Sequence, residues 1–104
     1  MHWLVFCVDK PNVSELRAEL TPAHLKYLDS KEHFIFVSAR QDSDDGSQYV
    51  GSMFILDVPN KAAAEDFIEG ETFYRAGLFQ TVIIRRLKRG RFHPELATAA
   101  EDRK

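Results

Sequence analysis

"YVGSMFILDVPNKAAAEDFIEGETFYRAGLFQTVII", residues 49–84, contains the pattern that decides the fold. Residues 49–58 are rich in β-branched and aromatic side chains, as is typical of a strand. Asn60 then opens an alanine-rich segment as a plausible helix cap, and we expect Gly70 to end that helix in a left-handed conformation. After a polar turn, residues 78–87 again have the composition of a strand. This half of the chain therefore predicts a β-α-β unit.

The first half of the sequence predicts a similar unit. Residues 2–8 form an apolar strand that ends at Asp9-Lys10-Pro11, and residues 33–40 form a second strand. Between them, Thr21-Pro22 resembles a helix cap followed by proline at the first helical position. We therefore expect a short helix over 13–20 and a second helix, or a kinked continuation, over 22–31.

The complete order is β-α-β-β-α-β, which is the α+β, ferredoxin-like arrangement with a four-stranded antiparallel sheet. A polar, acidic hairpin tip with Gly46 joins the two units. We place the domain at residues 1–90 and a polar C-terminal tail at residues 91–104, with a last helical turn after Pro94. The chain contains no repeat, and its length fits one domain.

Both faces of the predicted sheet are apolar, although two helical segments can cover only one of them. An exposed apolar face of this size is rare in a soluble monomer, so we predict a homodimer whose sheets pack face to face. Alternation assigns the strand residues to opposite faces as follows: Leu4, Phe6 and Val8 against Trp3, Val5 and Cys7; Phe34 and Phe36 against Ile35 and Val37; Met53 and Ile55 against Phe54 and Leu56; Phe79 and Ile83 against Val82 and Ile84.

The composition excludes several classes of protein. The net charge of −2 argues against nucleic acid or an anionic membrane as partner, and the basic run at 85–91 is explained by strand alternation and a solvated tail. A single cysteine, Cys7, excludes an internal disulfide and fits a reducing, cytoplasmic location. No membrane helix or signal peptide is expected. No metal or other cofactor is expected either, because the sequence offers no third ligand beside His24 and Glu71 and no nucleotide-binding motif.

His24 is the candidate proton-transfer residue. It lies near the apolar side of its predicted helix, with Leu20 and Leu28 one turn away on either side. If Thr21 caps that helix, the positive end of the helix dipole favours a neutral imidazole, and therefore a base. The alternative is a histidine at the edge of the core that is satisfied by a hydrogen bond.

Glu71 is the candidate carboxylate that orients His24 or shares its proton. It follows the predicted helix stop at Gly70 and begins a new turn, which aims Phe73 and Tyr74 towards a cleft beside the first helix. The alternative is a short helix whose aromatic side chains plug the end of the barrel. Arg40, Tyr74 and Arg75 are the candidate substrate-binding residues.

Four segments in order resemble the YciI-like (YCII-related) family: MHWLVFCVDKP, TPAHLKYL, YVGSMFIL and ETFYRAGLFQTVIIRRL. The resemblance covers roughly residues 1–89. It implies a dimeric α+β barrel and a site around a family histidine, which matches His24, and a family aspartate, where this chain has Glu71. It also implies lyase-type dehydrohalogenation for one branch of the family. Thr21 stands where the family has arginine, and Arg40 or Arg75 would have to supply that charge.

Two functions follow from this sequence. The first is a small-molecule lyase or isomerase that acts on a small aromatic or carbonyl-containing acid, with His24 and Glu71 as its acid-base pair. The second is a non-catalytic ligand-binding or accessory module that has kept the dimeric barrel.

Overall fold

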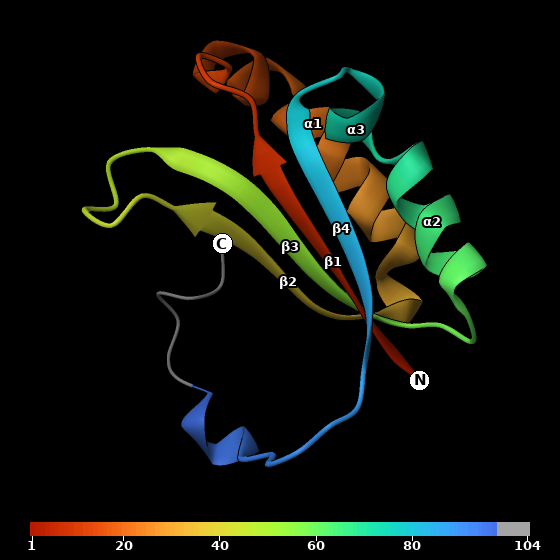
Figure 1. Ribbon diagram of the computed structural model, residues 1–104. Helices are drawn as coiled ribbons and strands as arrows, with labels where there is room; N and C mark the ends of the chain where they lie inside the picture. Colours follow the sequence, from red (N-terminus) through yellow and green to blue (C-terminus); the bar gives the residue numbers. More distant parts are fainter. Residues whose placement is uncertain (98–104) are drawn as a thin grey trace.

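A four-stranded antiparallel sheet with its helices packed on one face makes up the computed structural model, which describes residues 1–97 (Figure 1). The strands occur in the spatial order β2-β3-β1-β4. This is the predicted ferredoxin-like topology, and the fold prediction is confirmed. The elements are β1 (His2–Asp9), α1 (Ser14–Lys31), a 3-10 turn η1 (Glu32–Phe34), β2 (Ile35–Asp42), β3 (Tyr49–Asp57), α2 (Lys61–Gly70), α3 (Thr72–Arg75), β4 (Phe79–Leu87) and a second 3-10 turn η2 (Pro94–Leu96).

The core lies between the sheet and the helices. The two central strands bury alternate side chains towards the helices, and α2 and α3 supply the opposing layer. Because one strand face and one helix stripe meet here, this layer contains the apolar side chains that are buried away from water. The buried apolar residues are Val5, Cys7, Phe54, Leu56, Val58, Ala64, Phe67, Ile68, Phe73, Leu78 and Phe79.

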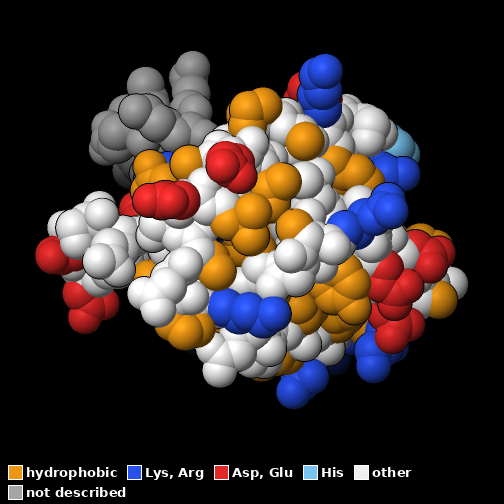
Figure 2. Space-filling view, turned by 90° about the horizontal axis from the view of Figure 1, so that it is seen from above, with side chains coloured by type: hydrophobic (Ala, Val, Ile, Leu, Met, Phe, Trp, Pro, Cys, Tyr) orange, Lys and Arg blue, Asp and Glu red, His pale blue; other side chains and the backbone are white. Residues whose placement is uncertain are grey.

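The opposite face of the sheet carries none of the helices of residues 1–97 (Figure 1), and it is also apolar. Phe6 pairs with Met53 on β3 and with Ile83 on β4, and Leu4 pairs with Ile55. These side chains are only partly buried. Figure 2 shows that, on the side seen there, hydrophobic side chains reach the surface at several places between charged groups.

The sheet faces predicted from strand alternation are wrong at two bulges. In β2, Ile35 pairs with Leu56 but Val37 pairs with Ile55, so Val37 lies on the helix-free face and Phe36 is unpaired and exposed. In β4, the register shifts after Val8, and Phe79 lies in the core instead of on the face of Ile83. A bulge adds one residue to one strand, which moves every following side chain to the other face.

Helix α1 is continuous through Pro22, so of the two predicted alternatives the continuation over 22–31 is present and the separate second helix is wrong. Thr21 does not cap a helix, because its hydroxyl donates a 2.7 Å hydrogen bond to the carbonyl oxygen of Arg17 one turn earlier. Proline at 22 has no N–H, so the helix lacks the hydrogen bond that this residue would otherwise donate to the carbonyl oxygen of Ala18. His24 therefore lies in the middle of α1, and the helix-dipole argument for its protonation state does not apply.

Gly70 ends α2 as expected, but not in a left-handed conformation, since positive φ among the described glycines occurs at Gly46 and Gly77. A side chain at 70 would instead collide with Tyr27, whose hydroxyl lies 2.8 Å from the ideal Cβ position. Gly77, with φ of 73°, ends α3 and turns the chain into β4. Asn60 caps α2 as predicted, accepting a 2.9 Å hydrogen bond from the backbone N–H of Ala63.

The predicted tail falls partly outside the described residues. The turn after Pro94 is present as η2, whereas residues 98–104 lie beyond the part of the chain that the structure describes. The domain boundary at residue 90 stays a prediction. No helix in residues 1–97 is both long enough and apolar enough to cross a membrane.

Candidate active site

His24 on α1 and Glu71 before α3 are in direct contact through His24 Nδ1 and Glu71 Oε1. The two residues are 47 positions apart, and α3 packs against α1 to bring them together. The Glu71 side chain is fully buried, and 12% of the His24 side chain is exposed. The histidine is thus the member of the pair that a ligand can reach.

The backbone of α3 fixes the position of the Glu71 carboxylate. Glu71 has extended backbone angles and caps α3, because its Oε2 accepts hydrogen bonds from the N–H groups of Phe73 at 2.9 Å and Tyr74 at 3.2 Å. These bonds satisfy one oxygen of a buried carboxylate and orient the other towards His24. The "ETFY" turn therefore holds the Glu71 carboxylate in a fixed position.

This geometry assigns the tautomer of a neutral His24. A carboxylate oxygen can only accept, so Nδ1 carries the hydrogen that it donates to Glu71. The other ring nitrogen, Nε2, then has a free lone pair and can accept a proton. The arrangement has the structure of a general base oriented by a carboxylate.

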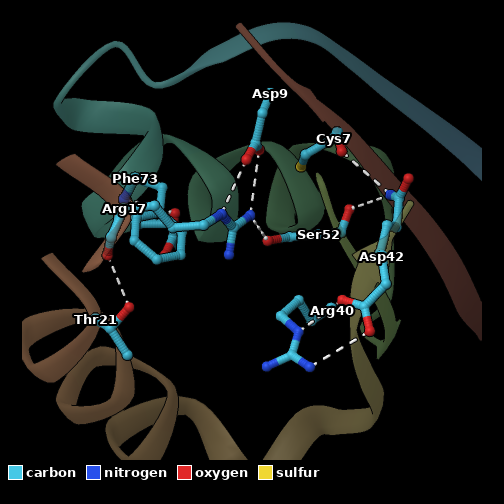
Figure 3. Close-up of polar contacts among 10 residues, drawn as sticks. Cys7, Asp9, Arg17, Thr21, Arg40, Asp42, Ser52 and Phe73 are labelled. Carbon is cyan, nitrogen blue, oxygen red and sulfur yellow. Dashed lines mark hydrogen bonds and ion pairs between the residues drawn. The ribbon is translucent and has the colours of Figure 1, made fainter. Parts of the chain in front are cut away.

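Phe73 links this pair to a second ion pair. The Phe73 ring is stacked on the His24 imidazole at 4.2 Å between centroids, and the guanidinium carbon of Arg17 lies 4.5 Å from the same ring centroid. Arg17 binds Asp9 through Nε at 2.9 Å and Nη2 at 3.1 Å, and Nη2 also donates to Ser52 at 2.8 Å (Figure 3). Arg17 and Asp9 side chains are only 6% and 4% exposed. A buried pair of this kind needs additional hydrogen bonds, such as the one to Ser52, to offset its desolvation.

A cavity of about 270 Å³ lies between α1 and the β2–β3 half of the sheet. It is large enough for a ligand of one substituted ring. Its wall combines aromatic and aliphatic side chains with a few polar groups: Arg17, Thr21, His24, Leu25, Leu28, Ser38, Ala39, Arg40, Tyr49, Ser52, Phe54 and Phe73.

Arg40 stands at the exposed side of this cavity. It binds Asp42 through Nε at 2.8 Å, and its guanidinium carbon lies 3.8 Å from the Tyr49 ring centroid. The hydrogen bond to Asp42 raises the pKa of Arg40 above its usual value, so the group is a permanent cation. Asp42 and Tyr49 thus hold a charged side chain that water still reaches.

Of the other expected binding residues, the structure does not bring Tyr74 and Arg75 to the cavity. Both side chains are exposed, and neither lines it. The turn that mounts Glu71 directs Phe73 inwards, and the next two residues of α3 consequently face the solvent.

Sequence reasoning missed Asp9, Arg17 and Ser52. A signal was present, because Arg17, Thr21 and His24 recur at spacings of four and three and so share one face of a continuous helix. Because a separate helix beginning at Thr21 was one of the two alternatives, this shared face was not recognised. In the sequence, Asp9 marks only the end of a strand.

Cys7 is buried behind this site and is not suited to act as a nucleophile. Burial, reinforced by the negative charges of Glu71 and Asp9, raises the pKa of Cys7 to about 12. The reactive form of cysteine is the thiolate. Cys7 is therefore a packing residue.

A second hollow, of about 370 Å³, lies beside the loop that joins β1 to α1. It contains no histidine, and its one acidic residue, Asp9, is already bound to Arg17. In residues 1–97 no group of three or more His, Cys, Asp or Glu residues is placed to hold a metal ion. The acid-base chemistry of the described residues is thus concentrated in the cavity of His24.

The chain matches known proteins over nearly its whole folded part. A model of the YCII-related domain matches residues 1–88. An uncharacterized protein of Haemophilus influenzae is 26% identical over 96 residues, covering 86% of this chain and 98% of that protein.

A solved structure is similar as well. The 5-chloro-2-hydroxyhydroquinone dehydrochlorinase of Burkholderia phenoliruptrix AC1100, in complex with 2,5-dihydroxybenzoquinone, is 29% identical, with a TM-score of 0.78 over 86% of this chain and 96% of that one. The similarity to the solved structure agrees with the βαββαβ topology, and the match to the family model shows that the chain belongs to the YCII-related family.

Proposed function

We propose that this protein is a small-molecule lyase or isomerase in which His24 moves a proton on a ring-shaped ligand. The observation that carries the proposal is the contact between His24, at the wall of the cavity, and the fully buried Glu71. A purely structural histidine needs no carboxylate that is itself held by two backbone N–H groups. The backbone hydrogen bonds that hold Glu71 against His24 thus exceed what packing of the histidine requires.

The proposed step begins with Nε2 of His24. This nitrogen removes a proton from a hydroxyl or a carbon of the ligand, while the Nδ1 hydrogen remains bonded to Glu71 and the carboxylate stabilises the imidazolium. In an isomerase, the electron pair that is released shifts a double bond, and the proton returns at another atom. In a lyase, the pair forms a new double bond and a leaving group departs with its own bonding electrons.

The similar dehydrochlorinase supports this reaction class. Its name describes the loss of hydrogen chloride from a chlorinated, hydroxylated ring. The cavity of this chain accommodates a molecule of that size, and aromatic side chains such as Phe54 and Phe73 form part of its wall. A flat ring would stack on such surfaces.

The test is a panel of chlorinated and hydroxylated ring compounds, including 5-chloro-2-hydroxyhydroquinone. Release of chloride and exchange of ring hydrogens with deuterated water would be measured. We expect turnover by the wild type and a loss of about 10²- to 10⁴-fold in His24→Gln. Equal rates in His24→Gln and wild type would overturn the proposal, and binding without turnover across the panel would favour a ligand-binding module.

We also propose that the protein is a homodimer in a reducing, cytoplasmic compartment. The unpaired Cys7 supports the compartment, and the helix-free apolar face of the sheet, around Phe6 and Met53, supports the dimer. Sedimentation analysis tests the assembly. A mass of 12.0 kDa that does not change with concentration would exclude it.

A further inference from the structure

The charged side chains that line the cavity are all basic, and their acidic partners lie outside its lining. Three basic side chains line it, namely Arg17, His24 and Arg40, and no acidic residue among residues 1–97 does. Each base nevertheless has an acid bound to it: Asp9 to Arg17, Glu71 to His24, and Asp42 to Arg40. The carboxylates therefore stand behind the bases, and the inner wall presents positive charge and hydrogen-bond donors.

Arg17 supplies the buried element of this wall. Its Nε and Nη2 are fully occupied by Asp9 and Ser52, whereas Nη1 has no hydrogen-bond partner within residues 1–97. Figure 3 shows this third nitrogen turned away from Asp9, towards the side on which Arg40 lies. Arg17 is only 5% exposed, so a charged donor is held, nearly dehydrated, at the cavity wall. Such a donor is most strongly satisfied by an anionic oxygen.

We propose that Arg17 and Arg40 form an anion-binding subsite, which makes the ligand an acidic ring compound whose charged oxygen lies between the two guanidinium groups. This proposal rests on the proposed function in placing the ligand in the cavity of His24. It assigns a separate task to each side of the cavity. The arginines bind and orient the charged oxygen, and His24 faces the atom that gains or loses the proton.

Two kinds of acidic ring carry this chemistry: a ring carboxylate, and a ring whose hydroxyl has ionised. Matched probes separate them, because each pair differs in its ability to carry charge. The first pair is 2,5-dihydroxybenzoate and 2,5-dihydroxybenzamide. The second is 2,5-dihydroxybenzoquinone, which ionises, and 2,5-dimethoxybenzoquinone, which does not. Dissociation constants would be measured by calorimetry on the full chain.

We expect the wild type to bind the charged member of at least one pair about tenfold or more tightly than the neutral member, since one charge-assisted hydrogen bond can supply this difference. Arg40→Gln should remove most of that preference, because it should weaken binding of the charged probe much more than binding of the neutral one. Arg40 is exposed, so this variant should fold. Arg86→Gln removes an exposed arginine outside the cavity lining and should keep the full preference.

Arg17 requires a paired change, because removing it alone would leave Asp9 buried without a partner. The double variant Asp9→Asn with Arg17→Gln removes both charges and should abolish the preference. Circular dichroism would show whether the double variant folds. If the double variant does not fold, the Arg40→Gln result alone tests the subsite. The subsite is refuted if neither pair shows a preference in the wild type, or if the preference survives in Arg40→Gln.

The pH dependence separates the arginines from His24. Arginine stays charged between about pH 6 and about pH 9, so the preference for 2,5-dihydroxybenzoate should be constant over that range. A preference that disappears as the pH rises would assign the anion to protonated His24 and overturn the subsite. His24→Gln should lose turnover but keep the preference. If the preference is found without any turnover, the subsite stands and only the proposed reaction fails.

Discussion

Replacing Glu71 by glutamine should move the ring hydrogen of neutral His24 from Nδ1 to Nε2. The amide oxygen can still accept from the N–H groups of Phe73 and Tyr74, which keeps the cap of α3. The amide nitrogen then faces Nδ1 as a donor, so Nδ1 must accept and the ring hydrogen moves to Nε2. The nitrogen that should act as base is thereby occupied.

The size of the effect follows from the three contacts of the carboxylate. Hydrogen bonds to a charged group contribute about 1.5–3 kcal/mol, and those between neutral groups about 0.5–1.5 kcal/mol. Because three such bonds become neutral, we expect a loss of about 1–3 kcal/mol in the free energy of unfolding. In a domain of this size, that lowers the melting temperature by about 5–15 °C. Turnover should fall by about 10²- to 10⁴-fold.

Nitrogen-15 NMR of the histidine ring distinguishes the two tautomers directly, and thermal unfolding gives the change in stability. Glu69→Gln is the matched control, because Glu69 is exposed on α2 and should alter neither measurement. Glu71→Asp keeps the charge but shortens the side chain by about 1.5 Å, and should lose the contact with His24. If Glu71→Gln retained hydrogen on Nδ1, or melted with the wild type, the assigned role of Glu71 would be wrong.

Three further predictions concern packing. Gly51→Ala should destabilise the fold by about 4 kcal/mol or more in urea unfolding, because its Cβ would lie 2.3 Å from the backbone oxygen of Cys7; a loss below about 1 kcal/mol contradicts this. Gly70→Ala should destabilise the wild type, because its Cβ would meet the Tyr27 hydroxyl at 2.8 Å. The loss in the free energy of unfolding should be smaller when Gly70→Ala is made in the Tyr27→Phe background. Equal losses in both backgrounds refute the contact. Burial raises the pKa of Cys7 from 9.0 to about 12, so the folded state favours the thiol. Stability from this group is complete below about pH 9 and is lost between about 9 and 12, and Cys7→Ala should flatten that part of the pH profile of unfolding.

The fold could be predicted because each element has a strong local signal. Alternating apolar residues, the Asn60 cap and the glycine that ends α2 all act within a few positions along the chain. The errors occurred where distant contacts override the local pattern. The bulge in β2 depends on its pairing with β3, and the need for glycine at position 70 depends on the close approach of Tyr27, which no local rule contains.

The site was predictable only in part, for the same reason. His24 and Glu71 stand out in the sequence by residue type and position, and the structure places them in contact. Whether they act in catalysis stays a prediction. Tyr74 and Arg75 were expected beside them because they are neighbours of Glu71 in sequence, but one turn of helix sends adjacent side chains in different directions.

The continuity of α1 explains why the two ion pairs occur together. Arg17 and His24 are seven residues apart, which is close to two helical turns, so an unbroken helix presents both to the same cavity. Their acids come from elsewhere: Asp9 from the end of β1 and Glu71 from the cap of α3. Phe73 contacts both bases, at 4.5 Å from Arg17 and 4.2 Å from His24. A break at residue 21 would rotate Arg17 and His24 apart. The hydroxyl of Thr21 is bonded to the helix backbone directly before Pro22. The geometry of the site therefore depends most on the helix at this position.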